Sequence, residues 1–83
     1  MIYGTMLLDT DMELFVAALS QTPVLVWQLN EHDMYVHVDS GIILKFAPDY
    51  VQIRSVHGLK HVACYPRDHC EFSVRLAGGQ RTI

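Results

Sequence analysis

Apolar and polar residues alternate along the segment from Met34 to Leu76, and residues typical of turns interrupt the alternation. A period of two residues predicts strands that bury one face and expose the other. When the segment is folded into successive antiparallel hairpins, its apolar residues fall on one surface. We expect this surface to form the core: Met34, Val36, Val38, Ile42, Leu44, Phe46, Val51, Ile53, Val62, Cys64, Phe72 and Val74.

Polar residues, proline and glycine mark the turns between these strands. The predicted turns are residues 30–33, 39–41, 47–50 and 57–58, followed by a loop around residues 66–68. Gly41 and Gly58 supply the conformational freedom that short hairpin loops need. The resulting registers pair Val38 with Ile42, Leu44 with Ile53, Phe46 with Val51, Ile53 with Val62, Val51 with Cys64, and Cys64 with Cys70.

Ahead of these strands, residues 10–21 predict an N-terminal amphipathic helix. Thr10 and Glu13 have the spacing of a capping box, in which each side chain binds the other residue's backbone amide. Pro23 disfavours helical geometry at the residue before it, so we expect the helix to end near Gln21. The apolar face of the helix consists of Met12, Phe15, Val16 and Leu19.

Two further segments complete the pattern. Residues 1–8 predict a short strand or an arm, and residues 77–83 a flexible tail. From Val24 the period of two predicts another strand, with Leu25, Trp27 and Leu29 facing inward and Val26 and Gln28 outward; in the last strand Cys70 and Leu76 also face inward.

Together these elements predict one α+β domain over residues 1–83, with an antiparallel meander of five or six strands in residues 24–76. The sheet is covered by the helix or curls into a small barrel. A short helix followed by a curled antiparallel sheet resembles the Sm-like RNA-binding fold. The Asp-to-Asn loop signature is missing, and Ile53-Arg54-Ser55 lacks the glycine that follows Ile-Arg in that family. The resemblance is one of topology, which by itself implies no function.

Composition and charge narrow the class of protein. The chain is 51% hydrophobic and 18% charged, as in folded globular domains. Its net charge of −3 disfavours a non-specific nucleic-acid binder, because such binders neutralise phosphates with Lys and Arg. No apolar run reaches the roughly 18 residues of a membrane span, and the first residues lack the basic region of a signal peptide, so we expect a cytoplasmic protein.

The sequence contains no motif that indicates catalysis. It has no glycine-rich phosphate loop, nucleophile elbow or HExxH pattern. Asp68, His69 and Cys70 are adjacent, but neighbours on a strand point to opposite faces and do not form a dyad. We therefore expect a protein that is not an enzyme.

A cluster rich in metal-binding residue types lies in the second half of the chain: His57, His61, Cys64, His69 and Cys70. Zinc takes four such donors in a tetrahedral arrangement. The spacing differs from known zinc fingers, and the predicted registers turn His61 and Cys64 to opposite faces. We favour reduced cysteines that pack as small apolar groups, and expect no cofactor.

The outward face of the predicted sheet is the candidate binding surface, with aromatic and basic side chains: Tyr35, His37, Ile43, Lys45, Arg54, His61, Tyr65 and Arg75. Tyr and Arg are enriched at protein interfaces. We expect a small non-catalytic protein-binding module, an inhibitor or adaptor of a larger protein, of the kind found among phage or mobile-element accessory factors. Such a module is also compatible with a homodimer. The alternative hypotheses are a single-stranded nucleic-acid binder that uses Tyr35, Lys45, Arg54 and Tyr65, and a zinc-stabilised module.

Overall fold

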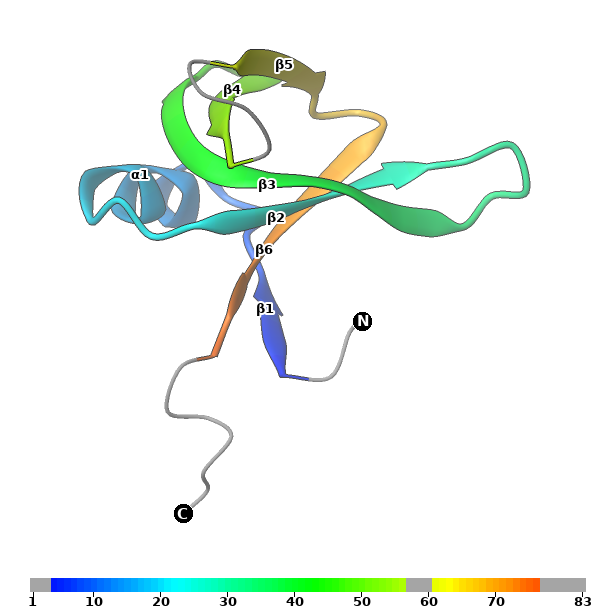
Figure 1. Ribbon diagram of the computed structural model, residues 1–83, viewed down its shortest axis with the longest axis horizontal. Coiled ribbons are helices and arrows are strands. Elements are labelled where there is room, and N and C mark those ends of the chain that lie inside the picture. The colour runs from blue at the N-terminus through cyan, green and yellow to red at the C-terminus, as the bar shows by residue number, and fades with distance from the viewer. Residues whose placement is uncertain (1–3, 57–60, 77–83) are drawn as a thin grey trace.

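The computed structural model of the protein describes residues 4–56 and 61–76. Over these residues the chain forms one helix and six strands. In chain order they are β1 (Thr5–Leu7), α1 (Asp11–Leu19), β2 (Val24–Leu29), β3 (Tyr35–Phe46), β4 (Tyr50–Ser55), β5 (Val62–Pro66) and β6 (Cys70–Arg75), as labelled in Figure 1. The predicted α+β class, with a helix and an antiparallel meander, is confirmed.

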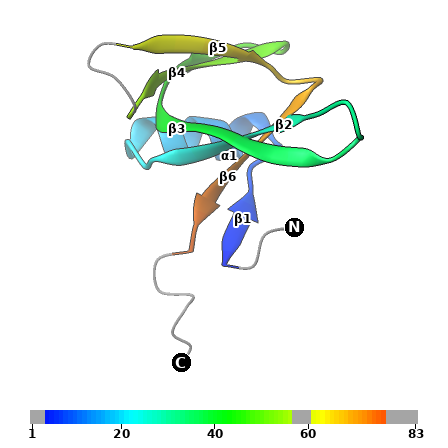
Figure 2. The same ribbon diagram turned by 45° about the vertical axis from the view of Figure 1, so that its right-hand side comes forward.

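All strands belong to one antiparallel sheet with the order β1-β6-β2-β3-β4-β5. Strands β2 to β5 follow one another as a meander. The chain then crosses back, so that β6 pairs with β2, and β1 pairs with the other edge of β6 (Figure 2). Strands β1 and β5 stand at the two ends of this order, and the sheet is not closed into a barrel.

The predicted pairing of the last two strands is wrong. The turn at residues 67–69 leads the chain away from β5, and the amide of Leu29 donates to the carbonyl of His69 at 3.0 Å as β6 joins β2. Cys64 lies opposite Gln52 on β4, whereas Cys70 lies opposite Gln28 on β2. The two cysteines are therefore on strands that are not neighbours, and both are free thiols.

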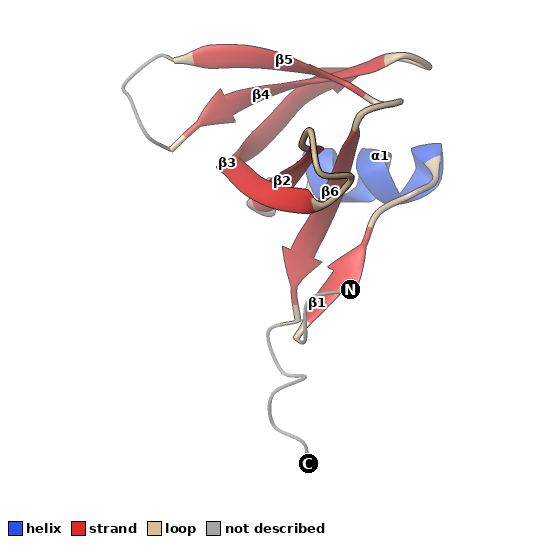
Figure 3. Cartoon of the chain, turned by 90° about the vertical axis from the view of Figure 1, so that its right-hand side faces the viewer, coloured by secondary structure: helices blue, strands red, loops and turns tan. Residues whose placement is uncertain are grey.

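Helix α1 packs against one face of the sheet, which we call the inner face; the opposite side is the outer face (Figure 3). The helix begins with the predicted capping box at Thr10 and Glu13 and ends at Leu19. Gln21 follows with a φ of 54°, a conformation that cannot continue a helix. The buried core between helix and sheet comprises Leu8, Leu14, Ala17, Val24, Val26, Ile43, Val51, Ile53, Cys70, Phe72 and Val74.

The helix presents a different side to the sheet than its apolar pattern predicts. Leu14 and Ala17 are buried, and Ala18 packs against the core. The predicted apolar face is exposed instead: Met12 (68%), Phe15 (50%), Val16 (54%) and Leu19 (73%). Both sides of this helix carry apolar residues, so its periodicity does not determine which side is buried. Small side chains at Ala17 and Ala18 suit close packing of helix on sheet.

The hairpin predicted at residues 39–41 does not form, because β3 runs without a turn from Tyr35 to Phe46. Gly41 instead allows a close approach of β3 to β4: a Cβ atom there would lie 2.8 Å from the carbonyl carbon of Arg54. The turn at residues 47–50 and the pairing of Phe46 with Val51 are confirmed.

A bulge at Leu44 reverses part of the expected pattern on β3. Ile43, expected on the outward face, pairs with Ile53 and is only 3% exposed, whereas Leu44 is exposed. A bulge adds one residue to a strand, so residues on its two sides change face relative to simple alternation. Met34, Val36 and Val38 are exposed as well, because the tip of the β2–β3 hairpin projects beyond the helix (Figure 1).

Two other strands differ from their predicted registers. On β2, Val24 and Val26 join the inner core, whereas Trp27 lies on the outer face. On β5, Ala63 pairs with Ile53 and Tyr65 with Val51, one residue away from the expected register. Such a slip turns every side chain of a strand over. As a result, Val62 and Cys64 are exposed and Tyr65 packs against the core. Leu76, which was expected to face inward, lies beyond the end of β6 and is also exposed.

The remaining predictions concern two turns, the C-terminal tail and membrane spans. The turn at residues 57–58 and the tail at residues 77–83 lie outside the described ranges. The turn at residues 30–33 is confirmed, with the Asn30 side chain accepting from the amides of His32 and Met34. In the part of the chain that is described, no helix has the length and apolar character needed to cross a membrane.

Candidate functional site

The outer face of the sheet carries a pocket of about 540 Å³, which we call the outer pocket. Strands β1, β2 and β6 form its floor, and the start of β3 forms one side. Its lining residues are Thr5, Leu7, Trp27, Met34, Tyr35, Glu71 and Ser73. These residues share a side because Trp27 pairs with Glu71 and Leu7 pairs with Ser73 across neighbouring strands. Pockets of this size hold small ligands or single side chains of a partner.

Two contacts fix the orientation of the Trp27 indole. Its Nε1–H donates a hydrogen bond to Ser73 Oγ at 2.9 Å. Its ring lies 5.2 Å from that of His37, at an angle of 51°. His37 is itself held by a 2.9 Å hydrogen bond between Nε2 and Ser40 Oγ. The pocket therefore has an aromatic wall whose position is set before any ligand arrives.

The charge of the outer pocket is negative. Glu71 is half-buried, and it is the only Asp, Glu, Lys or Arg among the described residues that line the pocket. No ion pair within residues 4–56 and 61–76 involves Glu71. A carboxylate beside aromatic rings, with no cation among the described lining residues, creates a site that attracts positive charge.

A second candidate surface is the exposed side of α1, formed by Met12, Phe15, Val16 and Leu19, which we call the helix face. These residues stand at positions i, i+3, i+4 and i+7, so they form one stripe along the helix. Helices that bind in the groove of another protein use anchors at this spacing. Four large apolar side chains on one short helix form a contiguous exposed patch, a feature of interaction sites.

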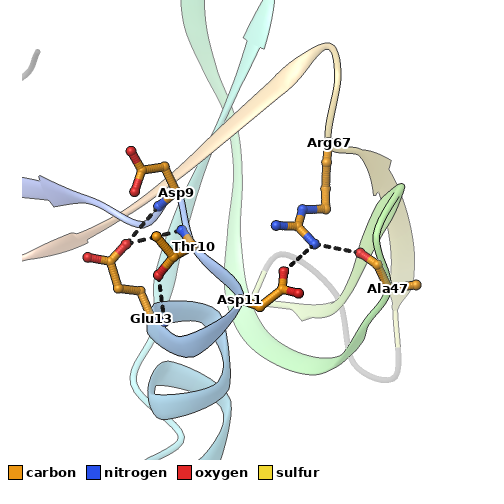
Figure 4. Close-up of polar contacts among 6 residues, drawn as sticks. All are labelled: Asp9, Thr10, Asp11, Glu13, Ala47 and Arg67. Carbon is orange, nitrogen blue, oxygen red and sulfur yellow. Dashed lines mark hydrogen bonds and ion pairs between the residues drawn. The ribbon is translucent and has the colours of Figure 1, made fainter.

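The start of α1 is held rigidly. The Thr10 hydroxyl accepts from the amide of Glu13 at 3.2 Å, and the Glu13 carboxylate accepts from the amides of Asp9 and Thr10 at 2.9 and 3.2 Å (Figure 4). The bond from the Asp9 amide is the main reason that the pKa of Glu13 is lowered. Arg67 Nη1 forms an ion pair with Asp11 Oδ1 at 2.8 Å and donates a hydrogen bond to the carbonyl of Ala47 at 2.7 Å. The helix is thus tied to two turns of the sheet.

A buried polar network on the inner face joins strands β3, β4 and β5. Asp39 is 4% exposed and accepts hydrogen bonds from Ser55 Oγ at 2.7 Å, from Tyr65 Oη at 2.6 Å and from the amide of Ser40 at 2.8 Å. Burial, together with the hydrogen bond to Asp39 and its negative charge, raises the pKa of Tyr65 from 10.0 to about 12. This tyrosine therefore stabilises the fold as a neutral donor.

This pKa shift predicts loss of stability at alkaline pH. Because the pKa of Tyr65 is higher in the folded chain than in the unfolded chain, its contribution is complete below pH 10 and is lost as the pH rises to about 12. Urea unfolding across this interval should give a falling free energy of unfolding, with a smaller fall in Tyr65→Phe. The exposed Tyr35→Phe should behave as the wild type. Equal falls in wild type and Tyr65→Phe would contradict the prediction.

The structure distributes the predicted binding surface over several places. Tyr35 lines the outer pocket, and the ring of His37 lies next to that of Trp27, its partner across β2 and β3. Lys45, Arg54, His61 and Arg75 are exposed. Lys45 lines a separate, open hollow of about 420 Å³ together with Tyr65. Ile43 is buried, as described above. Tyr35 and Lys45 lie near opposite ends of β3, so the residues proposed for single-stranded nucleic acid do not form one contiguous stacking surface.

Sequence reasoning missed Trp27, Glu71 and Leu7 as members of a site. The predicted inward position of Trp27 depended on Gln28 alone, because the run Val24-Leu25-Val26-Trp27 is apolar at every position and does not show which face is buried. Glu71 is brought to Trp27 only by the pairing of β6 with β2. One available signal is that Trp27 is the single tryptophan of the chain.

Among the described residues, the cysteines and histidines do not gather into a metal centre. Within the described ranges, no group of three or more His, Cys, Asp or Glu residues is placed to hold a metal ion. His57 lies outside those ranges. Cys64 is exposed on β5 and Cys70 is buried on β6. Burial, with a smaller effect from the charge of Asp68, raises the pKa of the Cys70 thiol, so this thiol stays protonated and is a poor nucleophile.

The outer pocket and the helix face are the two candidate sites that the described residues form. No protein-family model, curated protein or solved structure matches the chain.

Proposed function

We propose that this protein is a small, non-catalytic protein-binding module that docks the helix face of α1 into an apolar groove of a larger protein, which it inhibits or links to another component. One observation carries the proposal: Met12, Phe15, Val16 and Leu19 are exposed side by side on a helix whose opposite side is buried in the core. Burial of apolar area contributes about 25 cal/mol per Å², so covering this face favours association.

The rigidity of α1 supports the same function. The capping box and the Arg67 contacts hold the helix in its bound shape before it meets a partner. A preformed helix loses little conformational entropy on binding, so more of the contact energy appears as affinity. The apolar anchors are therefore presented by a rigid element rather than by a loop that must first become ordered.

Charge favours a different protein over a second copy of this chain. Asp9, Asp11 and Glu13 lie at the N-terminal end of the helix face, and the last turn of α1 has no basic residue. Arg67, the cation near that end, is already paired with Asp11. A second copy would thus bring no cation on its own helix to these carboxylates. A groove with basic residues at one end complements the helix face better.

The test compares two double variants, each of which replaces two exposed apolar residues with serine. Phe15→Ser with Leu19→Ser alters the helix face, and Leu44→Ser with Val62→Ser alters exposed positions on the sheet. A partner recovered from the native host is purified, and its affinity for each protein is measured by calorimetry. We expect the helix variant to weaken binding at least about tenfold and the sheet variant to leave it unchanged.

Two results would overturn this proposal. One is a partner that binds the helix variant and the wild type equally. The other is a stable homodimer, seen as concentration-dependent mass in sedimentation, which the helix variant abolishes. Circular dichroism of both variants checks that each remains folded, as expected for substitutions at solvent-exposed positions.

A further inference from the structure

We propose that the outer pocket binds an organic ammonium group, such as the quaternary ammonium of choline or of a methylated lysine side chain. This site lies on the outer face of the sheet, and its lining includes no residue of α1, so it is separate from the helix face. The proposal rests on the lining residues Trp27, Tyr35 and Glu71 and on the contacts that position them.

The first argument is the chemistry of the walls. Trp27 and Tyr35 contribute aromatic rings to one pocket, and Leu7 and Met34 contribute apolar surface. Aromatic faces attract cations through their quadrupole, most strongly for tryptophan, and quaternary ammonium groups are bound in cages of this kind. The methyl groups of such a cation also fit an apolar wall, which a small, strongly hydrated metal cation does not.

The second argument is the position of the charge. Glu71 stands directly across from Trp27 on the paired strands β6 and β2. Among the described residues, the pocket has no lysine or arginine in its lining, so an anion would meet a carboxylate with no compensating cation. A neutral apolar ligand would cover the half-buried Glu71 without neutralising it, which is unfavourable. A cation that also has apolar surface can neutralise the Glu71 carboxylate and contact the aromatic and apolar lining residues.

The third argument is that the site is preorganised. The bond from Trp27 Nε1–H to Ser73 Oγ uses the polar edge of the indole. The packing of Trp27 against His37 limits rotation of the ring. A ligand therefore meets an indole that is already oriented, and binding does not require Trp27 to be ordered first.

Trp27 also provides the measurement, because the chain contains no other tryptophan. Its fluorescence is followed during titration with choline and with dimethylbutanol, the uncharged carbon analogue of choline. We expect a saturable change with choline and at least about tenfold weaker binding of the neutral analogue. The same fluorescence titration is carried out with two short peptides that differ at one position. One peptide carries trimethyllysine there, and the other carries glycine and serves as its control.

The variants test the role of the carboxylate. Glu71→Gln keeps the shape of the side chain and removes its charge, and we expect about tenfold weaker binding of choline. Glu31→Gln, in the exposed turn after β2, removes the same charge from another place and should bind as the wild type does. The helix variant with Phe15→Ser and Leu19→Ser should also retain binding, which separates this site from the proposed protein-binding face.

The outcomes are distinct. Tighter binding of the trimethyllysine peptide than of choline supports the proposal and identifies a protein side chain as the source of the cation. Tighter binding of choline supports it with a small molecule as the source. The proposal is overturned if dimethylbutanol binds as well as choline, if Glu71→Gln has no effect, or if no cation changes the fluorescence at concentrations up to about 10 mM.

Discussion

Replacing Leu14 with alanine is expected to lower the free energy of unfolding by about 3 kcal/mol, whereas Leu19→Ala should change it by less than about 0.5 kcal/mol. The two leucines belong to the same helix, but Leu14 is 1% exposed and Leu19 is 73% exposed. Truncating Leu14 removes buried apolar surface and leaves a cavity between α1 and the sheet. Truncating Leu19 removes surface that water already contacts.

Urea unfolding of the two variants and the wild type measures this difference. We expect the midpoint to fall for Leu14→Ala with little change in slope, which indicates a loss of stability rather than a change in the unfolded state. Because both substitutions replace leucine by alanine in one helix, their helix propensities change equally. A greater loss for Leu19→Ala would mean that the helix face is buried and that the proposed contact surface does not exist.

The second large effect is expected at Gly41. A Cβ atom at this position would meet the backbone of β4, at 2.8 Å from the carbonyl carbon of Arg54 and 3.0 Å from the Cα of Ser55. Backbone atoms cannot move aside as the end of a flexible side chain can, so the strands must separate where Gly41 pairs with Ser55. We expect Gly41→Ala to lower the free energy of unfolding by about 2–3 kcal/mol.

Gly4→Ala is the matched control for this prediction. Gly4 has a φ of 84°, and a Cβ atom added there would meet no heavy atom of a described residue within 4 Å beyond its chain neighbours, so alanine is opposed by backbone conformation alone. That strain costs about 1 kcal/mol. Thermal and urea unfolding of both variants compare the two causes. If Gly41→Ala were no more destabilising than Gly4→Ala, the close approach of β3 and β4 would be wrong.

Local signals in the sequence were sufficient where the interacting groups are close in the chain. The capping box at Thr10 and Glu13 specified the start of α1, and Pro23 its approximate end. The turn at residues 47–50 brought Phe46 opposite Val51. In each case the two groups are separated by only a few residues, so their geometry depends little on the rest of the fold.

The candidate sites were less accessible to sequence reasoning. The residues of the helix face were recognised as one apolar side, but their helical spacing predicted that this side would be buried. Tyr35 was recognised as a surface residue, whereas its neighbours Trp27 and Glu71 in the outer pocket were not. Trp27 and Glu71 meet only after β6 crosses to β2, and residues 28–70 separate them in the chain.

By itself, the sequence determined a small α+β domain with a capped helix, the turns at residues 30–33 and 47–50, and an antiparallel meander. The tertiary structure decided which face of α1, β2, β3 and β5 is buried. Alternation in the sequence correctly placed Val51 and Ile53 of β4 and Cys70, Phe72 and Val74 of β6 in the core. Apolar residues occupy both sides of α1 and both faces of β2 and β3, so their burial depended on the bulge at Leu44, the one-residue shift of β5 and the return of β6 to β2. These features arise from contacts between distant segments, which alternation within one segment does not encode.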